Sequence, residues 1–111
     1  MENHFRVEVK TDGSRSVLAL RGELDLASAP ALDEELERVE AAGAKQVIID
    51  LRDLEFMDST GLSVLVRAHQ RAEKAGMRFG LVKGPPQVQR LLVLTGVAER
   101  ISVVDAVEEL L

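Results

Sequence analysis

The sequence predicts an α/β fold with a mixed, mainly parallel β-sheet of about five strands, flanked by about four helices. Strand-like and helix-like segments alternate along the chain, in the order β-β-α-β-α-β-α-β-α, which is typical of a parallel sheet. The apolar run QVIIDL (46–51) is expected of a central strand covered on both faces. The length of 111 residues indicates a single domain, 1–111.

Two alternating segments at the start of the chain predict a β-hairpin. FRVEVK (5–10) and SVLALRG (16–22) place apolar and polar side chains in turn, which is the period of a half-buried strand. TDGS (11–14) between them contains a glycine and is expected to turn. This N-terminal hairpin would give an otherwise parallel sheet its antiparallel edge.

The next segment has the signals of an amphipathic helix. Ser28 is a natural N-cap, and Pro30 falls in the first turn, where a missing N–H is tolerated. Gly43 is placed to end the helix in a left-handed conformation. The apolar residues that repeat at helical spacing are Leu32, Leu36 and Val39.

A second helix is predicted after the stretch FMDSTGL (56–62), and Gly76 is expected to close it. Its polar face is expected to contain Ser63, Arg67, Gln70 and Lys74. Its apolar face is expected to contain Leu62, Leu65, Val66, His69 and Ala72. We expect His69 to be a packed or half-buried structural residue rather than a metal ligand.

The C-terminal third continues the alternation. MRFGLV (77–82) predicts a strand, and a helix that stops at Gly96 follows the KGPP break. RISVV (100–104) predicts a last short strand, and Asp105 with Glu108 resembles the capping box of a terminal helix. The side chains expected on one side of the helix before Gly96 are Val88, Leu91, Leu92 and Thr95.

Composition excludes several classes of function. The chain has no cysteine, so disulfides, thiolate metal sites and cysteine nucleophiles are excluded. Its net charge is −5 and its basic residues are scattered, so we expect no nucleic-acid partner. No apolar run approaches the roughly 20 residues that span a bilayer, and the N-terminus lacks the layout of a signal peptide. We therefore expect a cytoplasmic protein without membrane insertion.

The polar tetrapeptide DSTG (58–61) at the start of the second helix has two interpretations. Asp58 can cap the helix, with Met57 packing on Leu62 as a hydrophobic staple, or Ser59 can be the cap. In either case Ser59 lies where free amides and the helix dipole favour an added phosphate. Gly61 is costly in a first helical turn and would be explained by the close approach of a partner's backbone. The residues alone favour a simple cap.

A phosphoaspartate receiver domain is a weaker alternative, because Asp50 ends an apolar strand. That chemistry needs a divalent metal held by acidic ligands from the first strand. Here the first strand ends EVKTDG, with no adjacent acidic pair, and the chain opens with a hairpin. No nucleophile elbow or phosphate-binding glycine loop is present either, so an enzyme lacks support.

The segments RGELDLASAPALDEEL and VIIDLRDLEFMDSTGLSVLVRAHQRA resemble the anti-sigma-factor antagonist family, which is built on the STAS domain. GELD (22–25) and DSTG (58–61) stand at the family's spacing, and the similarity spans nearly the whole chain. The resemblance implies the STAS fold and phosphorylation of Ser59 by an anti-sigma factor, an ATP-dependent serine kinase. The implied partner-binding residues are Glu23, Leu24, Asp25, Asp58, Thr60, Gly61 and Leu62.

The family's function implies a phosphorylation-controlled switch with no catalytic activity, metal site or cofactor of its own. Unmodified, it would bind the anti-sigma factor and so release a sigma factor; a PP2C-type phosphatase would reset it. Ser63 stands where members often have a second glycine. A STAS module with another role, such as a stressosome scaffold or a transporter-associated regulator, is the alternative.

Overall fold

A computed structural model describes residues 4–110 and confirms the mixed α/β architecture. The described residues form a sheet with the spatial order β1-β2-β3-β4-β5. β1 and β2 are antiparallel, as the hairpin predicted, and each later pair of neighbours is parallel. The strands are β1 (Arg6–Asp12), β2 (Arg15–Leu24), β3 (Gln46–Met57), β4 (Arg78–Val82) and β5 (Ser102–Val104).

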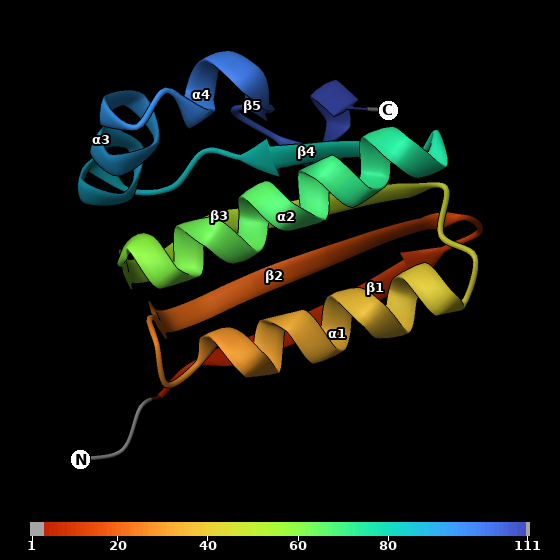
Figure 1. Ribbon diagram of the computed structural model, residues 1–111, viewed down its shortest axis with the longest axis horizontal. Coiled ribbons are helices and arrows are strands. Elements are labelled where there is room, and N and C mark those ends of the chain that lie inside the picture. Colours follow the sequence, from red (N-terminus) through yellow and green to blue (C-terminus); the bar gives the residue numbers. More distant parts are fainter. Residues whose placement is uncertain (1–3, 111) are drawn as a thin grey trace.

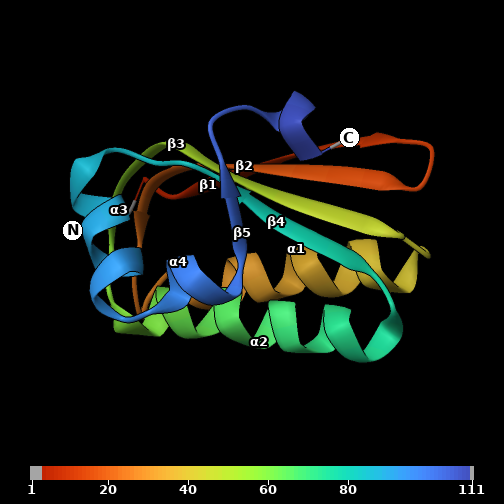
Figure 2. The same cartoon turned by 90° about the horizontal axis from the view of Figure 1, so that it is seen from above.

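The helices form a layer on one face of the sheet and a cluster at one of its ends. The helical elements are α1 (Ala29–Ala41), α2 (Ser59–Ala75), α3 (Pro86–Leu94), α4 (Val97–Arg100) and the 3₁₀ helix η1 (Val107–Leu110). α1 and α2 lie side by side under the sheet, whereas η1 lies on the opposite face (Figure 2). α3 lies at the end of the sheet where α2 begins (Figure 1).

The C-terminal segment differs from the sequence prediction in two ways. The terminal helix is a single 3₁₀ turn, and its capping carboxylate belongs to Glu109 rather than Glu108. Glu109 Oε2 accepts the amides of Asp105 at 3.0 Å and Ala106 at 2.9 Å. The second difference is the short helix α4, which follows Gly96 and was not predicted. Both elements are too short to give a periodic apolar signal.

The main core lies between the sheet and the two long helices. β2 and β3 supply fully buried aliphatic residues from the middle of the sheet, such as Leu18 and Ile49. Each fully buried side chain of this size stabilises the fold by about 1.5–3 kcal/mol relative to an exposed one. The buried helix residues in this core include Leu32, Leu36 and Val39 of α1 and Leu62, Leu65 and Ala68 of α2. The apolar repeat of α1 was therefore predicted correctly. In α2, Leu62, Leu65 and Ala72 are buried as predicted, whereas Val66 and His69 are half-buried. The buried apolar side chains of α2 that were not predicted are those of Val64 and Ala68.

β3 runs to Met57 rather than ending at Leu51, and it contains two bulges opposite β2. At each bulge β3 has one more residue than the β2 segment that it faces, as the register shows. Bulges bend a strand and increase its twist, and β3 curves toward the start of α2 (Figure 2). The register pairs on either side of the bulges are Ala19–Asp50, Arg21–Asp53, Gly22–Leu54 and Glu23–Phe56.

Within the first bulge of β3, the side chains of Asp50 and Arg52 form an ion pair. Asp50 Oδ1 accepts the Arg52 amide at 3.0 Å and Arg52 Nε at 3.0 Å, while Oδ2 accepts Arg52 Nη2 at 2.8 Å. The Asp50 side chain is 11% exposed. Burial by itself raises the pKa of the Asp50 carboxyl, but the hydrogen bonds and charge of Arg52 outweigh it and lower that pKa. Asp50 is thus a bulge-stabilising carboxylate.

The start of α2 packs directly against the end of β2. The amide of Asp58 donates to the Leu24 carbonyl at 3.1 Å. A Cβ atom on Gly61 would lie 2.5 Å from Leu24 Cγ and 2.8 Å from the Leu24 carbonyl oxygen. The expectation that a partner's backbone explains Gly61 is therefore wrong, because the close neighbour is the chain's own Leu24.

Asp50→Asn is expected to lower the free energy of unfolding by about 1–2 kcal/mol near neutral pH, because the charge-assisted pair with Arg52 is lost. Because the pKa of Asp50 is lowered in the folded protein, this stabilisation is fully present above the unfolded-state pKa of about 3.9. It is lost as pH falls through the folded-state pKa. Urea unfolding at about pH 7 and about pH 3 should therefore show the difference between variant and wild type shrinking in acid.

Asp53→Asn is the matched control for this measurement. Its carboxylate is 63% exposed and lies 3.8 Å from Arg21 Nη2, so its loss should change stability by less than about 0.5 kcal/mol. Equal effects of the two substitutions would contradict a special role for Asp50.

Gly61→Ala is expected to destabilise the protein by about 1–3 kcal/mol, since the new methyl group overlaps Leu24. This sign opposes helix propensity, which favours alanine over glycine by about 1 kcal/mol. Ser63→Ala on the same helix, at an exposed position, is the control and should be neutral or slightly stabilising. Urea unfolding compares the two; a stabilised Gly61→Ala variant would show that the approach to Leu24 is not limiting.

Candidate functional site

The GELD and DSTG motifs meet at the carboxyl ends of β2 and β3. GELD forms the last residues of β2, and DSTG turns the end of β3 into α2. The hydrogen bond from Asp58 to Leu24 joins them across this end of the sheet. Two segments more than thirty residues apart in the sequence therefore form one surface, at the left of Figure 1.

Asp58 is the N-cap of α2, which settles the choice between Asp58 and Ser59. Its backbone is extended (φ −102°, ψ −176°), and its Oδ1 accepts the Gly61 amide at 3.0 Å. Met57 and Leu62 are both buried in the main core beside this cap. Because Asp58 supplies the cap, the first helical residue, Ser59, has no capping role.

Ser59 is exposed at the first position of α2. No hydrogen bond among residues 4–110 uses its hydroxyl, although its carbonyl accepts the Ser63 hydroxyl at 2.9 Å. Thr60, the neighbouring hydroxyl, is half-buried. Of these two hydroxyl groups, that of Ser59 is the more accessible to a modifying enzyme.

The chain segments that meet beside this hydroxyl are rich in acidic residues. Arg67, two helical turns further on, is the first basic residue of α2, and it pairs with Asp33 at 3.4 Å. The positive end of the α2 dipole opposes this negative charge only within about one turn. The carboxylates in the segments next to Ser59 are those of Glu23, Asp25, Glu55 and Asp58.

The turn after β2 has its own hydrogen-bond network, and Ser28 is central to it. The Ser28 hydroxyl donates to the Glu23 carbonyl at 2.7 Å and accepts the Asp25 amide at 2.9 Å. Asp25 Oδ1 in turn accepts the amides of Ala27 at 3.0 Å and Ser28 at 3.1 Å. Ser28 is the N-cap residue of α1, as predicted, but its hydroxyl makes no capping hydrogen bond. It fixes the 23–28 turn instead.

Burial divides the residues that the resemblance implied for partner binding. Glu23 and Ser59 are exposed, and Asp25, Asp58 and Thr60 are half-buried. The other three are buried and support this surface from below. They are Leu24 (0% exposed), Leu62 (7%) and Gly61.

Two exposed apolar side chains near Ser59 were missed by the sequence analysis. Leu26 is 74% exposed in the 23–28 turn, and Phe56 is 46% exposed two residues before Asp58. Leu26 stands two residues after Leu24, as the next residue on the same face of a strand would. The sequence therefore gives no sign that the strand has ended. Phe56 faces outward because the second bulge shifts the alternation of β3. A bulge of this kind leaves no clear signal in the sequence.

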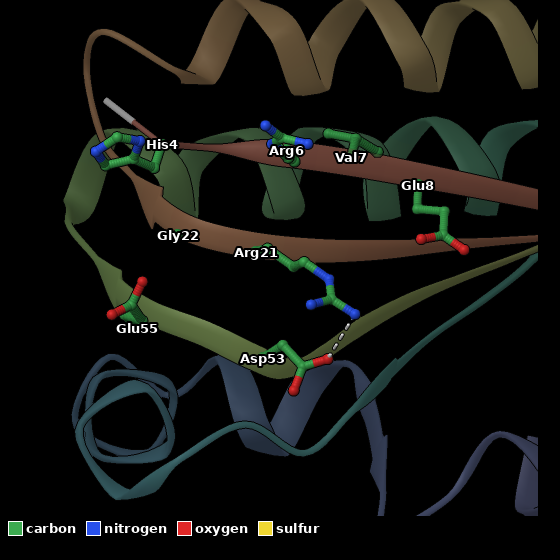
Figure 3. A pocket seen from close by; sticks show the side chains of 8 residues that line it. All are labelled: His4, Arg6, Val7, Glu8, Arg21, Gly22, Asp53 and Glu55. Atoms are coloured by element: carbon green, nitrogen blue, oxygen red, sulfur yellow. Dashed lines mark ion pairs between the residues drawn. The ribbon is translucent and has the colours of Figure 1, made fainter. Parts of the chain in front are cut away.

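A shallow pocket lies on the face of the sheet opposite α1 and α2, and Gly22 of the GELD motif is part of its lining. Arg21 reaches toward Asp53, 3.8 Å away, across its floor (Figure 3). Its charges are mixed, so it favours no single class of ligand, and it does not contain Ser59. It is lined by His4, Arg6, Val7, Glu8, Arg21, Gly22, Asp53 and Glu55.

The remaining candidate groups have structural roles. The imidazole of His69 is 19% exposed, as expected of a packed residue, and its ring centroid lies 5.9 Å from that of Phe79. Glu73, one helical turn later, approaches His69 Nε2 at 3.6 Å. Residues 4–110 contain no group of three or more metal-ligating side chains that could hold an ion. Within the same range, no helix is long and apolar enough to cross a membrane.

Comparison with known proteins agrees with this geometry. The STAS domain family matches residues 6–110. The anti-sigma-B factor antagonist of Bacillus subtilis (strain 168) is 33% identical over 100 residues, which cover 90% of this chain and 91% of that protein. The crystal structure of an anti-sigma factor antagonist from Mycobacterium paratuberculosis has a TM-score of 0.87 at 28% identity, covering 95% of this chain and 89% of that one.

SpoIIAA, a Bacillus cell fate determinant and anti-sigma factor antagonist, has the same fold. Its unphosphorylated form gives a TM-score of 0.78 at 24% identity, covering 95% of this chain and 90% of SpoIIAA. Its phosphorylated form gives 0.72 at 21% identity, covering 95% and 94%. The sheet order, the match over residues 6–110 and the Bacillus relative together identify the family: this chain belongs to the STAS domain family.

Proposed function

We propose that the chain is an anti-sigma factor antagonist, a cytoplasmic switch controlled by phosphorylation of Ser59. The observation that carries this proposal is the exposed, unengaged Ser59 hydroxyl at the start of α2, beside the GELD turn. Relatives of known function support it, since the Bacillus subtilis relative is an anti-sigma-B factor antagonist. The unmodified protein binds an anti-sigma factor that is also an ATP-dependent serine kinase, and a sigma factor is thereby released.

Phosphorylation ends this interaction without unfolding the domain. The phosphate adds roughly −1.5 to −2 charges and bulk to a surface built around a small hydroxyl. The fold tolerates it because Asp58, not Ser59, caps α2, and because the helix dipole favours an anion there. That SpoIIAA, with the same fold, has both unphosphorylated and phosphorylated structures is consistent with this expectation.

The chain supplies no catalytic group in this scheme. ATP and Mg²⁺ belong to the kinase partner, which transfers the terminal phosphoryl group of ATP to Ser59 Oγ while the serine proton is lost and ADP leaves. A PP2C-type phosphatase returns the serine to its hydroxyl form. Each partner reaches the same exposed end of the molecule.

Ser59→Ala is expected to change the free energy of unfolding by less than about 0.5 kcal/mol, since the hydroxyl is exposed and makes no hydrogen bond. The variant should take no phosphate from the kinase and ATP, and it should remain bound to the kinase. Mass spectrometry of peptides locates the phosphate after incubation with each anti-sigma factor kinase encoded in the same genome. Ser63→Ala is the control and should still be phosphorylated; phosphate retained on Ser59→Ala would refute the assignment.

Ser59→Asp is expected to fold normally but to bind the anti-sigma factor at least about tenfold more weakly, because it places a charge where the partner meets a hydroxyl. Circular dichroism checks the fold, and biolayer interferometry measures binding. Ser59→Asn adds nearly the same volume without charge and so separates steric from electrostatic effects. Wild-type affinity of the aspartate variant would contradict the charge mechanism.

A further inference from the structure

Large apolar side chains are exposed at only a few places among residues 4–110, and these lie on segments at the end of the sheet where β2, β3 and β4 finish. Those that are exposed are Leu26 (74%), Phe56 (46%), Val93 (64%) and Leu94 (76%). Leu26 lies between β2 and α1, Phe56 near the end of β3, and the other two at the end of α3. Both ribbon views place α3 and the start of α2 at this end (Figures 1 and 2). Gathered apolar exposure of this kind marks an interaction surface.

Leu26 is held in its exposed position by a rigid turn. Asp25 Oδ1 accepts the amides of Ala27 and Ser28, and the Ser28 hydroxyl bonds to the Glu23 carbonyl, so the backbone on both sides of Leu26 is fixed. A side chain on a preorganised backbone loses little conformational entropy when it binds. This turn therefore presents Leu26 outward as an anchor instead of leaving it on a mobile loop.

The α3 residues are fixed to the same surface. Gln87 Nε2, in the first turn of α3, donates to the Glu55 carbonyl at 2.9 Å, next to Phe56. At the other end of the helix, the Thr95 hydroxyl donates to the Leu91 carbonyl at 2.7 Å. The first bond joins the start of α3 to the end of β3, and the second is a local bond that closes the last turn of α3. In Figure 1 the start of α2 lies between α3 and the turn that carries Leu26.

The charged residues of the two motif segments next to Ser59 are all acidic. The acidic residues of the motif segments that meet there are Glu23, Asp25 and Asp58, and the whole chain has a net charge of −5. A partner with basic side chains at the matching positions would be attracted over distance and oriented. Apolar anchors inside a charged rim are the usual composition of a protein interface.

We propose that Leu26, Phe56, Val93 and Leu94 form a docking surface on both sides of Ser59, which extends beyond the GELD and DSTG motifs. Its occupant is the anti-sigma factor of the proposed function, on which this inference rests. That partner presents apolar pockets for these side chains within a rim of lysine and arginine. Leu26, Val93 and Leu94 determine which anti-sigma factor binds. Phosphorylation of Ser59, which lies between them, determines whether it binds.

The test measures the binding of purified variants to each anti-sigma factor encoded in the same genome, with ADP in place of ATP so that Ser59 stays unmodified. Leu26→Ala and the double variant Val93→Ala with Leu94→Ala are each expected to weaken binding about 10- to 100-fold. Leu26→Met keeps an apolar side chain of similar volume and should retain affinity within about threefold. Circular dichroism confirms that each variant folds, as expected for exposed positions.

Charge reversal tests the rim. Glu23→Lys is expected to slow association about tenfold at low salt, with a smaller effect at high salt, where charges are screened. Glu73→Lys is the matched control, since this exposed glutamate lies near the far end of α2, about 21 Å along the helix from Ser59. It should leave the association rate nearly unchanged.

The outcomes separate this inference from the proposed function. If an anti-sigma factor binds wild type and Ser59→Asp weakens binding, but the apolar variants bind like wild type, the docking surface is wrong and the switch stands. If the apolar variants and Glu23→Lys lose binding while the controls retain it, the docking surface is supported. If no anti-sigma factor binds wild type, both the proposed function and the docking surface are overturned.

Discussion

The contact between the end of β2 and the first turn of α2 is the constraint on which the rest of the site depends. The hydrogen bond from Asp58 to the Leu24 carbonyl contributes about 1 kcal/mol, and burial of the Leu24 side chain about 1.5–3 kcal/mol. Packing is therefore the larger effect, and it leaves no room for a side chain at residue 61. This fit turns Gly61 and Leu62 inward and leaves Ser59 outward.

The division of roles between two neighbouring residues explains how the site can be both stable and modifiable. Asp58 satisfies the helix amide of Gly61, so the structural requirement of the N-terminus is met without Ser59. A serine in the capping position would have its hydroxyl occupied, and a phosphate there would compete with the cap. Because Ser59 lies one residue after the cap, its hydroxyl oxygen makes no capping bond and still lies near the positive end of the α2 dipole.

Periodic patterns in the sequence were sufficient for the fold class, the N-terminal hairpin and the two long helices, because burial of one face imposes a regular repeat. The pattern placed Leu32, Leu36 and Leu65 in the core correctly. It did not reveal the bulges of β3, since an extra residue disturbs the alternation only locally, and Phe56 then faces outward. Ser28 was placed correctly at the N-cap of α1, but its hydroxyl bonds to the preceding turn, because a hydroxyl can bond to a turn as readily as to a helix.

Within the site, the motif residues could be found from the sequence, but their division into surface and support could not. Leu24 and Leu26 are chemically alike and two positions apart, yet one is fully buried and the other is 74% exposed. That difference arises where β2 ends, at a turn defined by the contacts of Asp25 and Ser28. Hydrogen bonds within a turn of this kind leave no periodic apolar pattern in the sequence.

The two bulges divide β3 into parts that can evolve separately. Gln46–Asp50 pairs with strands on both sides, whereas the arm 51–57 pairs with β2 alone. Leu51, Leu54 and Met57 tie this arm to the core, but the side chains between them are exposed. Substitutions at these exposed positions can change the surface beside the helix start while the sheet keeps its register. Related domains can therefore diverge in this surface without rebuilding the scaffold.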